Sequence, residues 1–454
     1  MNPSSPAVAR PSSVVGPALA VRLFLFAFVI VVAAEWFGPL AVPMGGTYKV
    51  VLLPLLWALL LGALWGIASK GLPGPLKADD TLQGLSALVL QPALLLFVGK
   101  LGLLVGGSLP KILQSGWALV FQEFGHFFGT MIFGLPVALL LGIKREAIGA
   151  TFSVGREPSL AIIGEKFGMD SPEGRGVLAE YMTGTIFGAV FIAIFAGLVA
   201  SLGIFNPLAL AMGAGVGSGS MMAAASGAIA AQEPAAMAKD IAAFAAASNL
   251  ITTTIGTYFT LFLSLPFTIW AYGVLEPILG RGRTIDTAEA PAPAVTAAAP
   301  KGHAKAAFGM PALLGIWVVV GFTALVGNLL GYKTPIDGAS IAGMAIILGT
   351  VIVGQAIYTL TRGVVPAVVW VTGVAMLLTY PSMPYAAEIA AMTGKINFLA
   401  LTTPMLAFAG LSIAKDIPVF RKLGWRIVVV SLMANAGTFL GAAIIAQIFM
   451  HNPT

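Results

Sequence analysis

The stretch VLLPLLWALLLGALWGIA, residues 51–68, contains no charged side chain, and its length approaches the roughly 20 residues that cross a ~30 Å hydrocarbon core as a helix. Similar apolar runs recur along the whole chain. Of its 454 residues, 58% are hydrophobic and only 9% are charged, whereas about a quarter of the residues in a soluble domain are charged. The sequence therefore predicts an all-α, polytopic transmembrane helical bundle.

Charged or Pro/Gly-rich stretches divide the apolar sequence into about 11–12 spans or half-spans. Arg22 before the apolar run 23–37 resembles the start of a signal peptide, but no clear cleavage site follows, so we expect a retained first span. The predicted spans are 21–41, 49–69, 85–107, 116–142, 177–203, 206–231, 241–275, 308–330, 339–361, 364–380, 397–413 and 425–449. This organisation predicts a multi-pass plasma membrane protein in the bacterial inner membrane, with the lipid bilayer as its first partner.

Composition and motifs argue against several function classes. The chain has no cysteine, and its histidines, His126, His303 and His451, are too scattered to form a metal site. The net charge of +6 is typical of the Lys and Arg that mark cytoplasmic loops, so we expect no nucleic-acid partner. Neither a P-loop nor a His-Glu-x-x-His sequence is present, which predicts a non-enzyme without a cofactor or a bound metal.

A polar, Ala/Pro-rich stretch near residue 290 cannot bury a core and is typical of a linker. We therefore expect a cytoplasmic tail (1–20), a first repeat of four spans (21–142), a central part (143–283), the linker (284–306) and a second repeat (307–454). The central part is expected to hold a broken-helix segment and a glycine-rich loop, and the repeats to contain broken or re-entrant helices.

The second repeat carries a weakened copy of the first. At a constant offset of 308 (410 − 102), Gly102-Leu103, Pro110, Gly116-Trp117, Val120 and Gly129-Thr130 recur as Gly410-Leu411, Pro418, Gly424-Trp425, Val428 and Gly437-Thr438. Upstream the offset is 292 (335 − 43), because Pro43, Gly46 and Gly62 recur as Pro335, Gly338 and Gly354. The change in offset predicts an insertion near 364–380, long enough for a short extra crossing.

An extra membrane crossing reverses the orientation of every span that follows it in the chain. Loop 108–116 carries the single base Lys111, whereas its copy, 412–424, carries Lys415, Arg421 and Lys422. By the positive-inside rule the second loop is cytoplasmic and the first is not. This pattern predicts an inverted-topology repeat, which is a common architecture of secondary transporters. The alternative is chance similarity among spans that are rich in Gly and Leu.

The segment TFSVGREPSLAIIGEKFG, residues 151–168, interrupts an apolar run with charges. Pro158 disfavours helix before it and starts a helix well. Helix amides after Pro158, together with Arg156 and Ser159, are then placed to bind an anion at a helix N-terminus in mid-membrane. The alternative is an interfacial loop in which Arg156 and Glu157 are ordinary solvated charges.

The stretch MGAGVGSGSMMAAASGA, residues 212–228, has glycine at alternate positions, and each glycine costs a helix about 1 kcal/mol relative to Ala. These glycines are Gly213, Gly215, Gly217 and Gly219. We expect an unwound loop whose free amides, with Ser218 and Ser220, hold a carboxylate as a backbone nest does. The alternative is close helix packing through small residues.

Further polar residues lie inside predicted spans. Asn249 and Thr253 are four residues apart, so they share one helix face and either line a solute path or bond between helices. Glu35, Glu123 and His126 are candidates for coupling to a cation, either Na⁺ or H⁺. Glu123 and His126 form a structural hydrogen bond in the alternative interpretation, in which Glu35 lies at the membrane interface.

The order of these motifs resembles a known family. A Gly/Pro/Ser segment precedes Gly164-Glu165-Lys166-Phe167-Gly168, and Thr183-Gly184, Gly188-Ala189 and a Gly/Ser loop follow. Over roughly residues 145–230 the chain is similar to the LrgB/CidB-like membrane proteins, the larger subunits of LrgAB/CidAB systems. That family was first described as holin-like and includes small-carboxylate carriers. The chain also resembles a bacterial membrane family that has no assigned function.

Together these features predict a secondary transporter of a small organic anion, a mono- or dicarboxylate, that works by alternating access. Its expected binding residues are Arg156, Glu157, Ser159, Gly215, Gly217, Ser218, Ser220 and Asn249. One alternative is a holin-like or regulatory membrane protein linked to cell-wall metabolism. Another is an amino-acid exporter with Glu157 or Glu165 at its site. The sequence leaves the assembly open between a monomer and a homodimer.

Overall fold

The computed structural model describes residues 16–45, 48–72, 74–115, 117–280, 308–363, 365–413, 415, 417 and 424–450. Most of the expected tail (1–20) and the whole expected linker (284–306) lie outside these residues. Arg421 and Lys422 also lie outside them, as do the side chains of Arg156 and Glu157.

The described chain is an all-α bundle, which confirms the predicted fold class. Eight of its helices are long and apolar enough to cross a membrane, or nine if α17 (Ala386–Gly394) and α18 (Phe398–Ile413), bent by 55°, form one broken span. The full-length helices are α1 (Pro17–Phe37), α3 (Asp80–Gln114), α4 (Ala118–Leu140), α7–η3–α8 (Pro172–Ser201), η5–α13 (Thr260–Leu279), α14 (Met310–Tyr332), α15 (Gly338–Leu360) and α20 (Trp425–Phe449). The protein is therefore a multi-pass membrane protein.

Shorter helices complete the bundle. Three of them are apolar: α2 (Pro54–Ala68), α10 (Gly219–Ala230) and α16 (Ala367–Thr379). The others that bear on the argument are α5 (Glu146–Thr151), α6 (Arg156–Lys166), α9 (Pro207–Ala214), α11 (Ala238–Thr254) and α12 (Gly256–Phe259).

The boundaries of two predicted spans were wrong. The run expected to start a span at 49 instead forms β2 (Tyr48–Leu52), which pairs antiparallel with β1 (Leu40–Gly45), and α2 begins only at Pro54. The run 241–275, expected as one span, is divided among α11, α12 and η5–α13. Apolar content alone does not distinguish a short buried strand from a helix, because both bury the same side chains.

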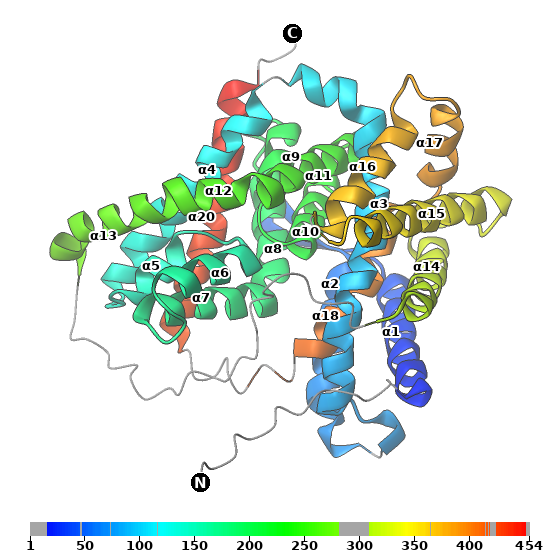
Figure 1. The fold of residues 1–454 in the computed structure, drawn as a ribbon, viewed down its shortest axis with the longest axis horizontal. Coiled ribbons are helices and arrows are strands. Elements are labelled where there is room, and N and C mark those ends of the chain that lie inside the picture. The colour runs from blue at the N-terminus through cyan, green and yellow to red at the C-terminus, as the bar shows by residue number, and fades with distance from the viewer. Residues whose placement is uncertain are drawn as a thin grey trace.

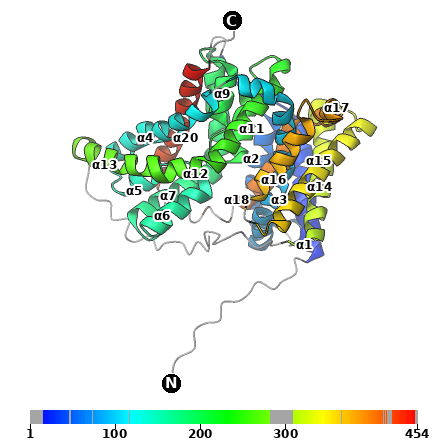
Figure 2. The same ribbon diagram turned by 45° about the horizontal axis from the view of Figure 1, so that its top comes forward.

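Figures 1 and 2 show the arrangement of the bundle. The central helices α8–α11 lie between one group that contains α4, α5–α7, α13 and α20 and another that contains α1–α3 and α14–α18. Helix α9 packs on α20, while α11 packs on both α9 and α3. The central part of the chain therefore joins the two groups.

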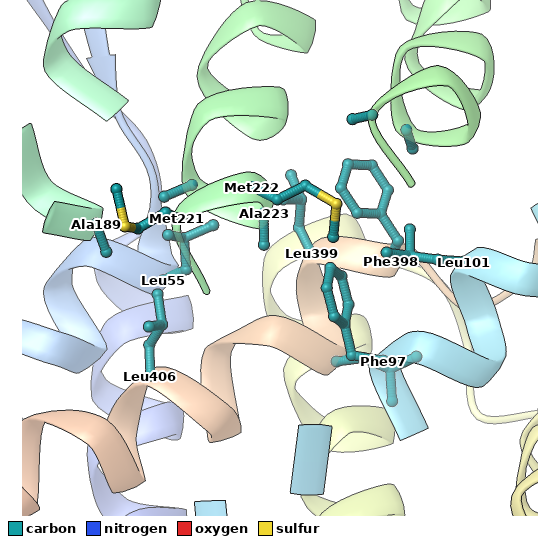
Figure 3. Packing of buried hydrophobic residues seen from close by; sticks show 14 of the residues in the cluster. Leu55, Phe97, Leu101, Ala189, Met221, Met222, Ala223, Phe398, Leu399 and Leu406 are labelled. Atoms are coloured by element: carbon teal, nitrogen blue, oxygen red, sulfur yellow. The ribbon is translucent and has the colours of Figure 1, made fainter. Parts of the chain in front are cut away.

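Methionines of α10 fix that helix in the core. Met221 and Met222 are 4% and 3% exposed. Figure 3 shows Met221 beside Ala189 and Leu55, while Met222 points toward Leu399. Because thioether side chains fill irregular gaps, this packing ties α10 to its neighbours and fixes the position of the chain break that precedes it.

A close helix crossing in the core joins α4 to α20. A Cβ atom on Gly129 would lie 2.1 Å from the carbonyl oxygen of Gly437, and one on Gly437 would lie 2.2 Å from that of Gly129. The hydroxyl groups of Thr130 and Thr438 hydrogen-bond beside this crossing. Only glycine permits such an approach of two backbones.

The helices α4 and α20 run antiparallel. Phe121, near the start of α4, stacks on Phe449, at the end of α20, with ring centroids 4.5 Å apart. Trp117 precedes α4 and Trp425 begins α20. These tryptophans therefore lie at opposite ends of the helix pair.

We predict that Gly437→Ala destabilises the protein strongly, because its Cβ forces the two helix backbones apart, at a cost of about 1–3 kcal/mol or more. Gly315→Ala is the matched control, since a Cβ at Gly315 meets nothing within 4 Å. Alanine is the better helix former, so the control should unfold at the wild-type temperature or above it. Thermal unfolding of the purified protein in detergent measures both, and equal midpoints for the two variants would contradict the prediction.

Candidate functional site

A cavity of about 240 Å³ lies where α3, α4, α6, α10 and α11 meet. Its polar lining residues are Gln91, His126, Ser153, Ser159, Ser218, Ser220, Asn249, Thr252, Thr253 and Thr260. Its apolar lining residues include Leu94, Met222, Val368 and Met405. Leu94 lies near the middle of α3, so the cavity is at mid-length of a full span.

The first chain break at the cavity separates α5 from α6. Helix α6 begins at Arg156, after the N-cap Gly155, and the amide of Ser159 already donates to the carbonyl of Gly155 at 2.9 Å. The expectation that the helix starts after Pro158 was therefore wrong. Pro158 lies in the first turn of α6. The amides of a first turn have no acceptor within the helix, so the N–H that proline lacks costs no hydrogen bond there.

Ser159 is the polar side chain of α6 that reaches the cavity. It is 1% exposed, and its Oγ has no hydrogen-bond partner within the described structure. A buried hydroxyl without a partner is costly, which indicates that a ligand or water satisfies it. The described structure does not include the side chains of Arg156 and Glu157, which follow the N-cap.

The second break separates α9 from α10, and it is shorter than expected. Gly213 still belongs to α9 and Gly219 already begins α10, so only 215–218 are unwound. Gly217 has φ +83°, a left-handed conformation that glycine adopts without strain. Ser218 caps α10 through its Oγ, which accepts from the amide of Met221 at 3.3 Å.

The glycines of this break differ in role. Gly217 lines the cavity, as do Ser218 and Ser220, whose hydroxyls lie 2.9 Å apart. A Cβ on Gly215 would instead lie 2.4 Å from the side chain of Ser248. Gly215 is therefore a packing residue against α11, which matches the helix-packing alternative for that position.

Asn249 holds the break in place. Its Nδ2 donates to the carbonyls of Gly215, at 2.7 Å, and Gly217, at 3.3 Å. Ser248 donates to the carbonyl of Met212 at 2.7 Å. These bonds satisfy carbonyl groups that the interrupted helix leaves without partners. Asn249 both lines the cavity and positions the backbone that forms its wall.

Glu123 and His126 lie beside the cavity on α4. Glu123 Oε1 accepts from Thr252 Oγ1 at 2.5 Å and from Gln122 Nε2 at 2.6 Å. His126 Nδ1 lies 3.6 Å from Glu123 Oε2, and each side chain is 1% exposed. Both ring nitrogens of His126 and Oε2 of Glu123 have no hydrogen-bond partner within the described structure. His126 lines the cavity and Glu123 lies behind it.

Glu35, the other coupling candidate, lies elsewhere. It is 2% exposed, and its Oε1 accepts from Thr403 Oγ1 of α18 at 2.6 Å. It packs against Gly327 and Gly331 of α14 and does not line the cavity. It lies near the end of α1 and is buried against other helices, whereas the neighbouring Trp36 is 80% exposed.

Sequence reasoning missed two polar residues of α3. Gln91 lines the cavity, and the signal was an amide next to Pro92 inside an apolar span. Lys100 is 2% exposed, and its Nζ donates to the carbonyl of Thr393 at the end of α17 at 2.6 Å. A charged residue inside a predicted span is rare enough to have identified Lys100.

The comparisons with known proteins identify a family and no relative. The model described as "Protein of unknown function (DUF3100)" matches residues 32–274, which is more than half of the chain. No curated protein and no solved structure matches the chain. The match leaves the resemblance to the LrgB/CidB-like proteins untested.

We predict that Asn249→Leu lowers the thermal midpoint in detergent, because it leaves two buried carbonyls without a donor, each at a cost of about 1–3 kcal/mol. The matched control is Thr254→Val on the same helix. Its hydroxyl bonds only carbonyls of its own helix, those of Leu250 and Ile251. A control that loses as much stability as Asn249→Leu would contradict the holding role of Asn249.

Proposed function

Because the chain belongs to the DUF3100 family, a family defined without a function, we propose its function from the cavity: it is a secondary transporter of a small organic anion, a mono- or dicarboxylate. The carrying observation is that the N-termini of α6 and α10 reach one cavity. Gly155 and Ser159 approach it from the first break, and Gly217 and Ser218 from the second.

Two helix N-termini favour an anion. Each carries unpaired amide donors and about half a positive charge from the helix dipole. The hydroxyls of Ser159, Ser218 and Ser220 add donors at the same place. No carboxylate occurs among the described side chains that line the cavity. This combination supports a carboxylate ligand, with Arg156 as an added charge at the start of α6.

The same features argue against an amino-acid exporter. An amino acid also brings an ammonium group, which needs a carboxylate partner in a low-dielectric site. Glu165, one candidate for that role, is exposed and does not line the cavity. The volume of about 240 Å³ favours a solute smaller than the drug-sized ligands of typical pockets.

We also propose the inverted repeat. Thr130 and Thr438 are equivalent at the offset of 308 (438 − 130), and so are Gly129 and Gly437 (437 − 129). Each residue of these pairs contacts its own counterpart across the α4–α20 crossing. Reciprocal contact between equivalent residues is what a two-fold axis produces. Because the two helices are antiparallel, such an axis lies in the membrane plane.

For the helices that precede α4 and α20 in the chain, the packing supports a different alignment of the two repeats from the one at the offset of 292. Gly62 of α2 packs against Gly410 of α18, and Gly102 of α3 packs against Thr372 and Ala375 of α16. Gly102 and Gly410 are equivalent at the offset of 308, so this packing supports α16 as the counterpart of α2. The segment 364–380 then needs no insertion, and the matches at the offset of 292 are better explained as chance similarity.

A holin-like or regulatory protein is the second candidate, favoured by the resemblance to LrgB/CidB-like proteins. Such a protein has no need of two apposed helix ends around a small cavity, whereas a carrier does. The cavity geometry therefore supports the carrier. The bacterial inner membrane is the location that we propose for it.

We predict that Trp117→Cys and Trp425→Cys react with a membrane-impermeant maleimide from opposite sides of the membrane. The chain contains no native cysteine to interfere, and both side chains are largely exposed, at 68% and 64%. Intact cells and inside-out vesicles report the two sides. Labelling of both positions from one side would refute the inverted repeat.

We predict that proteoliposomes with the purified protein show saturable exchange of at least one carboxylate from a panel of acetate, lactate, pyruvate, succinate and malate. Alanine and lysine serve as the amino-acid arm and should not exchange. Leakage of all solutes alike would instead support a holin-like pore. Absence of any carboxylate exchange by folded protein would refute the carrier.

Variants localise this exchange to the cavity. Gly217→Ala should reduce it strongly, because a left-handed conformation costs a non-glycine residue roughly 1–2 kcal/mol and displaces the amides of α10. Gly273→Ala in α13 is the control, since a Cβ there meets nothing within 4 Å. Arg156→Ala should raise the apparent KM for the exchanged carboxylate. Normal exchange by Gly217→Ala would remove the second break from the binding site.

A further inference from the structure

We infer that His126 and Glu123 bind the proton that drives transport, so that a monocarboxylate moves together with one proton and without net charge. This inference rests on the proposed function and specifies its coupling ion. Both residues were candidates for either Na⁺ or H⁺, and their arrangement around the cavity decides between these ions.

The two residues lie at different depths from the cavity. His126 lines the cavity, and Glu123 lies behind it, with Nδ1 and Oε2 3.6 Å apart. Glu123 Oε1 is held by Thr252 and Gln122, so Oε2 is the oxygen left to face the imidazole. The side chain is therefore fixed in one orientation, with one proton-accepting atom directed at the histidine.

The site is poorly built for Na⁺. Sodium needs several oxygen ligands around one point, and Glu123 Oε1 is already occupied by two donors. The remaining oxygen, Oε2, has no hydrogen-bond donor among the described residues and lies 3.6 Å from Nδ1 of His126. An imidazole and a carboxylate both bind and release protons, whereas an imidazole nitrogen is not the oxygen ligand that Na⁺ needs, so a proton is the cation that suits this pair.

Among the side chains that the structure describes, few other charges face the pair. His126 is the one ionisable group among the described residues that line the cavity. The elements packed on α4 bring their charged or ionisable residues to helix ends or to other partners: Lys239 and Asp240 on α11, Tyr258 on α12, Tyr272 and Glu276 on α13, Glu146 on α5, and Arg426 on α20. Asp240 pairs with Lys111 at 2.6 Å and Glu276 with Lys144 at 2.7 Å.

Coupling follows from the charges. A protonated His126 attracts a carboxylate bound at the helix ends, and the bound carboxylate makes protonation of His126 more favourable. By linkage, each ligand raises the affinity of the site for the other by the same factor. A carboxylate of charge −1 and a proton of charge +1 then cross together, which avoids the cost of an uncompensated charge in a low-dielectric core.

Lactate counterflow and lactate accumulation in proteoliposomes test the inference, with succinate as a second probe. With an acidic exterior, wild-type protein should accumulate lactate by up to about tenfold for each pH unit of gradient. An electrical potential without a pH gradient should give no accumulation of lactate. Glu123→Gln and His126→Gln should lose the accumulation, while counterflow stays measurable in Glu123→Gln.

Glu35→Gln is the matched control, because Glu35 is also a buried carboxylate that accepts from a threonine, yet it lies away from the cavity. It should accumulate lactate as the wild type does. Should the glutamine variants fail to fold, wild-type protein in weak buffer supplies the readout: lactate binding should take up one proton per molecule, measured with a pH dye.

The outcomes separate the two proposals. Absence of counterflow of either probe in the wild type refutes the proposed function for these carboxylates, and this inference with it. Counterflow without accumulation under a pH gradient, or without proton uptake on binding, refutes proton coupling alone. Accumulation that survives in Glu123→Gln and disappears in Glu35→Gln moves the coupling site to α1 and refutes the assignment to His126 and Glu123.

Discussion

Backbone amides and carbonyls within a membrane need partners inside the protein, and that constraint governs the centre of this structure. A helix that is interrupted at membrane depth exposes such groups at considerable cost, unless the interruption is buried in protein or lines a cavity. The breaks before α6 and α10 meet this requirement at the same cavity. Neither break has another evident reason to exist in so apolar a chain.

The groups that hydrogen-bond to the backbone at the two breaks also determine which sign of charge the site favours. Asn249 donates to carbonyls of the second break. The acceptor groups that follow the end of α9 therefore have a partner within the protein. Only some of the amides at the two helix N-termini have an acceptor. The amide of Gly155 donates to Ser153 Oγ, and the amide of Met221 donates to Ser218 Oγ. What faces the cavity is therefore an excess of donors, which is the arrangement that binds anions.

The sequence predicted the helices well because absence of charge over about 20 residues has few interpretations in a membrane protein. It also predicted an interruption near each break, but the first lies before Arg156 and not at Pro158, and the second is shorter than the run of glycines. It did not predict that Ser159 and Ser218, in segments far apart in the chain, line one cavity, because tertiary packing decides that. The hairpin of β1 and β2 escaped notice because β2 is mostly apolar and Val50 is buried as it would be in a helix.

The two halves of the chain contribute unequally to the site. Among the described residues, the polar ones that line the cavity lie between Gln91 and Thr260, and the C-terminal part of the chain adds the apolar Val368 and Met405. The family match, 32–274, spans all of these polar residues together with Glu123. The proposed two-fold axis at the α4–α20 crossing would therefore relate helices around the cavity without duplicating its chemistry. A single set of donors beside a single ionisable pair matches the proposed co-transport, which requires one anion and one proton.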